Sequence, residues 1–134
     1  MNNDFYYNFE NQFRGSRDEI IRRLSSYDGL MKLIGDFHEN PNFLDVGCGR
    51  GEWLHKCNEY GFDSIGIDIN EEMISFSKKL GLNVVNCDAI EFLKNTSSHS
   101  FDVISFFHII EHLSHDQILT LINESRRILK NNGL

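Results

Sequence analysis

The sequence has 134 residues, 40% of them hydrophobic and 25% charged, which fits one globular domain. Its formal net charge of −7 argues against nucleic acid as a partner, because binding to phosphate backbones needs clustered excess Lys and Arg. No stretch approaches the roughly 20 apolar residues that span a bilayer. The N-terminus also lacks a basic region followed by an apolar core, so we expect a soluble, cytoplasmic protein without an integral membrane segment.

Residues 1–13 are rich in Asn and aromatic side chains, which is typical of an arm that packs onto a core without forming an element of its own. Ser16 and Glu19 then have the spacing of a capping box, and apolar residues recur at helical spacing as far as Ile34. This pattern predicts one helix before the core, with Asp28-Gly29 as the place where it can kink.

From Asn42 onward, short apolar runs alternate with helical patterns, as in a parallel sheet whose crossover helices cover its faces. A helix is expected after each of the first three strands: one with Trp53 on its apolar face, one from Asn70 closed by Gly81, and one over residues 89–95. The expected strands are residues 42–46, 63–68, 82–86 and 101–106.

A last helix is predicted to begin at a second capping box, Ser114 to Gln117, and to end at Asn132-Gly133. Leu134 would then open another strand. A doubly wound sheet that stopped at its fourth strand would leave a long apolar edge, which natural proteins avoid. We therefore expect an α/β fold, a doubly wound Rossmann-like parallel sheet truncated after the fourth strand and its helix.

The segment from Asp45 to Gly51 is typical of a buried strand that runs into a glycine loop and then a helix. Glycine lets the backbone turn tightly and lets a ligand approach closely. A dinucleotide fingerprint has the pattern G-x-G-x-x-G, whereas the third glycine here arrives one residue early. This spacing favours a ligand without a pyrophosphate, although the loop taken alone also fits another nucleotide loop or a tight turn.

Two carboxylates follow the next two strands. Asp68 should lie beside the glycine loop, because the carboxyl ends of parallel strands meet at one edge of a sheet, and it can accept both hydroxyls of a ribose. Asp88 can accept the exocyclic amine of adenine. Each aspartate alone can also be a helix cap or loop residue, although Asn70 is the better cap beside Asp68.

Together these features resemble the successive motifs of class I S-adenosylmethionine-dependent methyltransferases. The resemblance implies an enzyme that transfers methyl groups with S-adenosylmethionine as cofactor. It also implies an N-terminal arm and helix covering the cofactor site, residues 1–40, and an incomplete S-adenosylmethionine-binding core, residues 41–134. The segments that carry the resemblance are Asp45–Gly51, Gly66–Asn70, Cys87–Ala89 and Phe101–Leu113.

The same resemblance implies roles for single residues. The loop at Gly47, Cys48 and Gly49 would lie under the methionine part and the ribose. Asp45 would help to orient the amino group, and Asp68 would hold the ribose. Asp88 and Ala89 would meet the adenine, and the stretch from Phe106 to His108 would pass beside the cofactor and face the acceptor pocket. The cofactor residues implied in this way are Asp45, Gly47, Cys48, Gly49, Gly51, Asp68, Ile69, Asp88, Ala89, Phe107 and His108.

A closer resemblance involves Phe13–Arg17, Gly49–Leu54 and Phe107–Leu113. These segments resemble the methyltransferase domain of bacterial O-antigen chain-terminating enzymes, which methylate a terminal sugar or its phosphate. This implies a small-molecule or glycan acceptor and a role in polysaccharide biosynthesis. Arg14 and Arg17 would then close over the cofactor carboxylate or reach an anionic acceptor, although both also fit a solvated helix start.

The segment from His108 to His112 matches the H-x-x-E-H pattern of inverted zinc metalloproteases. It follows a buried apolar strand and no further ligand motif follows it, so a protease is disfavoured. Some methyltransferases hold a divalent metal here with E-x-x-E-H, but His108 replaces the first glutamate, and we assign no metal ligand. His108 and His112 are the catalytic candidates, with three roles open: general base for an acceptor hydroxyl, shaping of the pocket, or metal binding.

Two other interpretations of the whole chain compete with methyl transfer. A nicotinamide-dependent oxidoreductase is disfavoured by the glycine spacing. A binding module that holds the cofactor without transferring its methyl group stays an alternative, because intact cofactor motifs do not guarantee catalysis.

Overall fold

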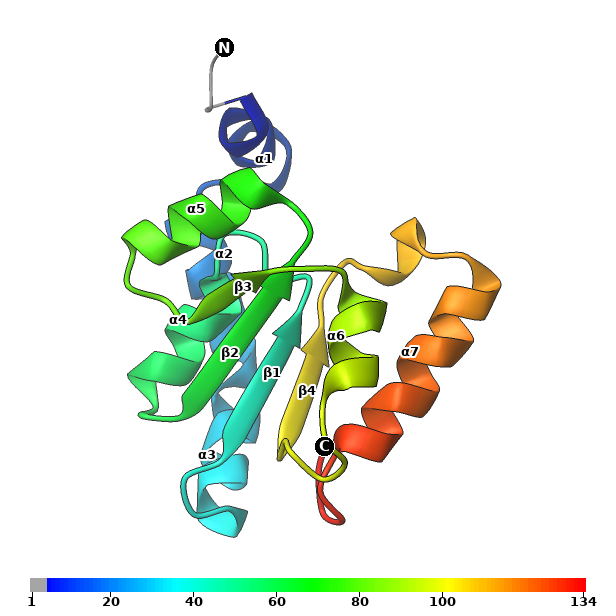
Figure 1. Cartoon of the computed structure of the whole chain (residues 1–134). Coiled ribbons are helices and arrows are strands. Elements are labelled where there is room, and N and C mark those ends of the chain that lie inside the picture. Colours follow the sequence, from blue (N-terminus) through cyan, green and yellow to red (C-terminus); the bar gives the residue numbers. More distant parts are fainter. Residues whose placement is uncertain (1–4) are drawn as a thin grey trace.

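The computed structural model describes residues 5–134, except for the side chains of Tyr6 and Tyr7. Four parallel strands form one sheet in the order β3-β2-β1-β4, which confirms the expected α/β fold (Figure 1). The third and fourth strands begin later than predicted. The strands are β1, Asn42–Val46; β2, Asp63–Asp68; β3, Val84–Asn86; and β4, Val103–Phe106.

Alternation along β1 divides its side chains between the two faces of the sheet. Leu44 and Val46 belong to one core cluster, whereas Phe43 belongs to another, and Asp45 shares the face of Phe43. The register pairs Asp45 with Ser105 on β4, so these two side chains lie on the same face. This places a carboxylate at the carboxyl end of a buried strand.

Helices cover both faces of the sheet (Figure 1). Leu93 and Leu121 pack with Leu44 on one side, and Met31 and Trp53 pack with Phe43 on the other. Residues 5–134 contain no helix that is long and apolar enough to cross a bilayer. The helices on the first side are α6, Ala89–Asn95, and α7, His115–Ile128; those on the second are α3, Asp28–Phe37; α4, Glu52–Glu59; and α5, Glu71–Lys79.

The N-terminal part differs from the prediction of an arm followed by one helix. Its elements are α1, Phe5–Arg14; α2, Arg17–Arg23; and the 3-10 helix η1, Leu24–Tyr27. Helical spacing in α1 brings the rings of Phe9 and Phe13 together, with centroids 4.5 Å apart and planes tilted by 41°, a contact that favours the helix. Residues 1–4 of the predicted arm lie outside the described residues.

The break at η1 also replaces the predicted kink at Asp28-Gly29. The Ser26 hydroxyl donates to the carbonyl oxygen of Arg23 at 3.1 Å, a local contact that competes with regular helical hydrogen bonds. The tighter turn separates α2 from α3, and it places Leu24 and Tyr27 along a cavity described below. The predicted helix is therefore divided by a 3-10 segment that ends directly before the expected kink at Asp28-Gly29.

The predicted helix ends are confirmed in several places and wrong in one. Ser114 and Gln117 form both hydrogen bonds of a capping box. At Ser16 only half of the box forms, because the Glu19 carboxylate pairs with Arg23 at 2.6 Å instead. α6 covers residues 89–95 as predicted, and Gly81 follows α5 with a φ of 76°.

α7 ends at Ile128, earlier than the predicted Asn132-Gly133. The chain after it turns back to the edge of β4. There the amide of Leu134 donates to the carbonyl oxygen of Asp102, and the amide of Ile104 donates to that of Leu134, both at 2.9 Å. Leu134 therefore pairs with β4 as a residue of a next strand would.

Candidate functional site

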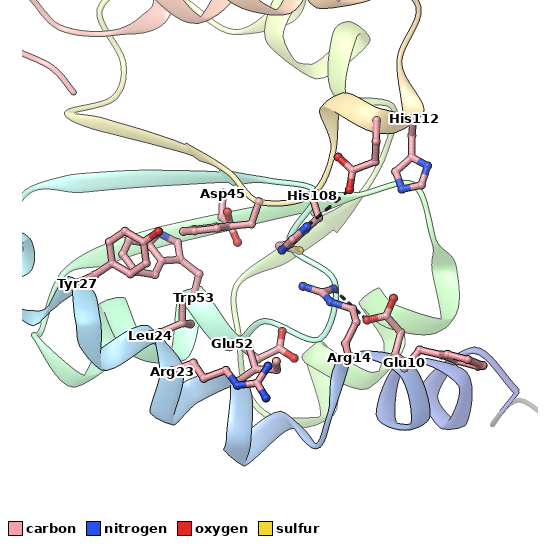
Figure 2. Close-up of a pocket in the computed structure, with 16 residues that line it drawn as sticks. Glu10, Arg14, Arg23, Leu24, Tyr27, Asp45, Glu52, Trp53, His108 and His112 are labelled. Atoms are coloured by element: carbon pink, nitrogen blue, oxygen red, sulfur yellow. Dashed lines mark hydrogen bonds and ion pairs between the residues drawn. The ribbon is translucent and has the colours of Figure 1, made fainter.

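A cavity of about 630 Å³ lies between the N-terminal helices and the carboxyl ends of β1 and β4 (Figure 2). It brings together predicted site residues from both ends of the chain, including Arg14, Asp45 and His108. Segments 1–40 and 41–134 thus both contribute to its walls. The lining residues are Glu10, Phe13, Arg14, Ile20, Arg23, Leu24, Tyr27, Asp45, Gly47, Cys48, Glu52, Trp53, Phe107, His108, Glu111 and His112.

The glycine loop between β1 and α4 is held by main-chain hydrogen bonds. The amides of Gly47 and Cys48 donate to the carbonyl oxygen of Ile67 on β2, at 2.8 and 3.0 Å. Gly49 has a φ of 51°, and a Cβ added to it would meet nothing within 4 Å. A ligand can therefore approach the main chain closely at this point.

Gly51 faces the interior instead of the cavity. It has a φ of 72° and is the residue before α4, and a Cβ added to it would overlap Cδ1 of Leu82. The absence of a side chain lets the start of α4 pack closely against its neighbours. The structure therefore gives Gly51 a packing role, and its predicted contact with the cofactor stays a prediction.

Asp68 lies at the carboxyl end of β2, directly beside the loop. Its Oδ2 accepts from the amide of Gly49 at 2.9 Å, and its Oδ1 accepts from the amide of Asn70 at 2.8 Å. Asn70 is the cap of α5, as the sequence indicated. Each carboxylate oxygen has two lone pairs, so Asp68 keeps acceptor capacity for ribose hydroxyls. Ile69, the next residue, is exposed.

The residues predicted to meet adenine lie outside the cavity. Asp88 is exposed and caps α6 by accepting from the amide of Glu91 at 2.9 Å. Ala89 is the first residue of that helix. The amide of Cys87 donates to the carbonyl oxygen of Asp68 at 3.1 Å, so the ends of β2 and β3 are adjacent. The adenine contact stays a prediction.

Asp45 is a buried carboxylate on the wall of the cavity. Its Oδ1 accepts a hydrogen bond of 2.7 Å from the hydroxyl of Ser105, its register partner on β4. Burial raises the pKa of Asp45 to about 7, and the negative charges of Glu52 and Asp68 add to the rise, while Ser105 opposes it. Protonation of Asp45 is therefore coupled to any charge that enters the cavity.

His108 follows β4 in the left-handed backbone region, with a φ of 56°. Its Nδ1 lies 3.6 Å from Oε1 of Glu111. His112 ends the 3-10 helix η2, Ile110–His112, so His108 and His112 do not share one face of a long helix. Within residues 5–134, no group of three His, Cys, Asp or Glu side chains could hold a metal ion. The segment lacks the helical geometry of a zinc protease.

The two predicted arginines are placed differently. Arg14 lines the cavity and forms an ion pair of 2.9 Å with Glu10 on the same helix. Arg17 does not line it; its Nε donates to the carbonyl oxygen of Arg50 at 3.1 Å. Arg17 thereby fastens α2 to the glycine loop, and a direct contact with the cofactor stays a prediction.

The cavity has an aromatic wall, of which the sequence indicated only Phe107 as a site residue. Tyr27, Trp53 and Phe107 come from three separate segments, and the centroids of their rings lie 5.2 to 5.8 Å apart. Helical periodicity marked Trp53 only as a core residue, because spacing cannot reveal which apolar face borders a cavity. The other lining residues that the sequence did not single out are Glu10, Phe13, Ile20, Arg23, Leu24, Glu52 and Glu111.

Comparison with known proteins decides the class of this site. Residues 43–133 match the sequence pattern of a family described as a methyltransferase domain. The chain belongs to this family. The match argues against the nicotinamide-dependent oxidoreductase, and it confirms the expected class of enzyme.

The methyltransferase domain is also similar to solved structures. A SAM-dependent methyltransferase from Archaeoglobus fulgidus is 41% identical, with a TM-score of 0.82 over 95% of this chain and 54% of that one. This similarity supports S-adenosylmethionine as the cofactor. The bifunctional kinase-methyltransferase WbdD has a TM-score of 0.69 over 85% of this chain and 27% of that one, but at 19% identity it shows the fold alone.

Among curated relatives, a ubiquinone biosynthesis O-methyltransferase from Hahella chejuensis is 29% identical over 81% of this chain and 45% of its own length. The methyltransferase domain spans about half the length of the curated relatives it matches. The residues present fit the cofactor: Gly49 offers open main chain, Asp68 offers acceptors beside it, and Asp45 offers a carboxylate to an ammonium group.

Proposed function

We propose that this domain transfers a methyl group from S-adenosylmethionine to an oxygen atom of a small-molecule or glycan acceptor. The observation that carries the proposal is the shared cavity. Asp45 and Cys48, at the glycine loop, line the same space as His108 and His112, which follow β4. The methionine end of the cofactor and the acceptor would therefore meet in one place.

When bound, S-adenosylmethionine supplies a methyl group on a positively charged sulfur, which an oxygen nucleophile can displace in line. The contribution of the chain is to position both partners and to exclude water. The helices α1 and α2 and the aromatic wall form the outer side of the cavity. Positioning of this kind can lower a barrier by about 7–11 kcal/mol in the best-aligned cases.

His108 is the candidate general base in this proposal. An imidazole can accept a proton near neutral pH, and an acceptor hydroxyl must lose its proton as it is methylated. Glu111, 3.6 Å from Nδ1 of His108, would stabilise the imidazolium that results. His112 lines the same cavity and is the alternative base.

For the acceptor, we propose a terminal sugar or sugar phosphate of a bacterial surface polysaccharide. Oxygen as the accepting atom is supported by the O-methyltransferase relatives. The wall formed by Tyr27 and Phe107 offers flat apolar surface to a ring, and Arg14 and Arg23 offer positive charge to a phosphate. A phosphate oxygen would already be anionic and would need no base. A cytoplasmic location stays a prediction.

The test has two stages. Calorimetric titration with S-adenosylhomocysteine measures cofactor binding, and transfer of labelled methyl groups to sugars, sugar phosphates and phenols measures acceptor choice. Saturable binding with transfer to a sugar or sugar phosphate is the expected result. Absence of S-adenosylhomocysteine binding would overturn the cofactor assignment, and binding with transfer only to phenols would overturn the glycan acceptor alone.

A further inference from the structure

Glu52, the first residue of α4, is a buried carboxylate that faces the cavity (Figure 2). Only 8% of its side chain is exposed, yet it is a lining residue. Its Oε1 accepts from Nε of Arg50 at 2.7 Å. The described residues give its Oε2 no hydrogen-bond partner. A carboxylate oxygen in this position is available to a ligand.

Arg50 holds Glu52 and is not one of the residues that line the cavity. Its side chain is 1% exposed, and its Nη1 donates to Oδ1 of Asn11 at 2.7 Å and to the carbonyl oxygen of Gly15 at 3.1 Å. The guanidinium is therefore tied to α1 as well as to α4. Arg50 therefore holds Glu52 through Oε1, and among the described residues it is the one cation that pairs with Glu52.

Asp45 is arranged in the same way on another wall of the cavity. Ser105 holds its Oδ1, and the described residues give its Oδ2 no partner. The charge of Glu52 contributes to the raised pKa of Asp45, which indicates that the two carboxylates influence each other. A buried carboxylate is costly without a positive partner, and among the described residues Glu52 has one in Arg50 whereas Asp45 pairs with no cation.

The cations that line the cavity are already paired with other carboxylates. Arg14 pairs with Glu10 at 2.9 Å, and Arg23 pairs with Glu19 at 2.6 Å. Neither arginine forms an ion pair with Asp45 or Glu52. The group that fits between these carboxylates is a ligand cation with several N–H donors, which is the chemistry of a primary ammonium.

We infer that Glu52, together with Asp45, binds the α-ammonium group of the cofactor's methionine part, with Arg50 as the residue that positions Glu52. This inference rests on the proposed function, because it assigns a further residue to the same cofactor site. Asp45 and Glu52 flank the glycine loop, one near the end of β1 and the other at the start of α4, so a methionine part bound at this loop would lie near both.

The test combines a change in the protein with the matching change in the ligand. S-adenosylhomocysteine and its deaminated analogue, which lacks only the α-ammonium group, are titrated by calorimetry against the unmodified protein and against Glu52→Gln. We expect the unmodified protein to bind the deaminated analogue at least about tenfold more weakly, since charged hydrogen bonds contribute about 1.5–3 kcal/mol. Glu52→Gln should lose the same factor for S-adenosylhomocysteine and little more for the analogue.

Glu59→Gln is the matched control, because Glu59 is an exposed glutamate of the same helix outside the cavity. It should leave the affinity for both ligands unchanged. Glu52→Asp keeps the charge on a shorter side chain and should show an intermediate loss of affinity for S-adenosylhomocysteine. It replaces Glu52→Gln in the comparison of the two ligands if Glu52→Gln does not fold.

Three results would overturn the inference. Equal loss of both ligands in Glu52→Gln would mean that Glu52 only supports the loop, and unchanged affinity for S-adenosylhomocysteine would mean that Glu52 does not touch the ammonium. If the unmodified protein bound neither ligand, the cofactor assignment itself would fail and the inference with it. If Glu52→Gln loses affinity for S-adenosylhomocysteine but not for the deaminated analogue, both the cofactor assignment and the role of Glu52 are supported.

Discussion

The amide of Gly49 donates a 2.9 Å hydrogen bond to Oδ2 of Asp68, so the carboxylate at the end of β2 fixes the glycine loop that follows β1. The other oxygen of Asp68 accepts from the amide of Asn70. One side chain therefore holds two segments at the place where the ribose of the cofactor is expected.

Replacing Asp68 with Ala should weaken binding of S-adenosylhomocysteine by at least about tenfold, because hydrogen bonds to a charged group contribute about 1.5–3 kcal/mol. Calorimetric titration measures this loss. Asp63→Ala is the control, since Asp63 is an exposed aspartate at the opposite end of β2, and it should bind as the unmodified protein does. Equal binding by both variants would remove Asp68 from the cofactor site.

Asp45 should make the stability of the ligand-free protein depend on pH. Burial raises its pKa from 3.8 to about 7 in the folded state, so the folded state holds a proton more tightly than the unfolded state does. The free energy of unfolding should therefore fall as pH rises from about 4 to about 7 and stay level above that, by up to about 1.4 kcal/mol per pKa unit.

Asp45→Asn removes this titration. The variant should match the stability of the unmodified protein near pH 4 and exceed it near pH 8. Urea denaturation at about these two pH values, which bracket the titration of Asp45, measures the difference. Its binding of S-adenosylhomocysteine should be weaker and less dependent on pH. A stability difference that is the same at both pH values would contradict the raised pKa.

Gly51 should be required for packing and Gly61 only for its backbone conformation. Both have a φ of 72°, but a Cβ at Gly51 would overlap Leu82, whereas one at Gly61 would meet nothing within 4 Å. Gly61→Ala should lower the free energy of unfolding by about 1–2 kcal/mol, the cost of the left-handed region. Gly51→Ala should have the same backbone cost and should lower the free energy of unfolding by a further amount of about 1–3 kcal/mol, because its Cβ overpacks the interior.

Urea denaturation measures the free energy of unfolding of the two glycine variants. Because the backbone cost is common to both, the difference between them is the cost of overpacking at Gly51. Similar losses in the two variants would show that the interior can yield at Leu82 and that Gly51 is not a packing residue.

His108→Asn tests the proposed base. Asn tolerates the left-handed backbone that His108 adopts, so the fold should be kept. The turnover number for a hydroxyl acceptor should fall by about 10²-fold or more, with a much smaller change in S-adenosylhomocysteine affinity. His112→Asn is the comparison. Equal, modest losses in both variants would indicate that the histidines only shape the cavity.

Much of the core could be predicted from the sequence because its signals are local. Alternating apolar runs located β1 and β2, and cap residues such as Asn70 and Ser114 located helix starts. The order of the glycine loop and Asp68 indicated the cofactor edge, since parallel strands bring their carboxyl ends together.

The N-terminal part could not be predicted in this way. α1 is aromatic-rich and carries few strong helical signals, but it is stabilised by contacts with distant residues, including the hydrogen bond between Arg50 and Asn11. The break at Leu24–Tyr27 likewise has only a weak local signal. Tertiary contacts outweighed intrinsic propensity in α1, whereas the break coincides with the local hydrogen bond from Ser26 to Arg23.

The sequence by itself therefore determined the class of fold, the cofactor loop and the strand-end carboxylates, because spacing along one chain is enough to define them. Only the tertiary structure decided which residues share the cavity. It placed Glu52 on the wall and Gly51 in the interior, and it turned Arg17 towards the loop. Neighbours in sequence can face opposite sides, and that choice is made by packing against segments far away in the chain.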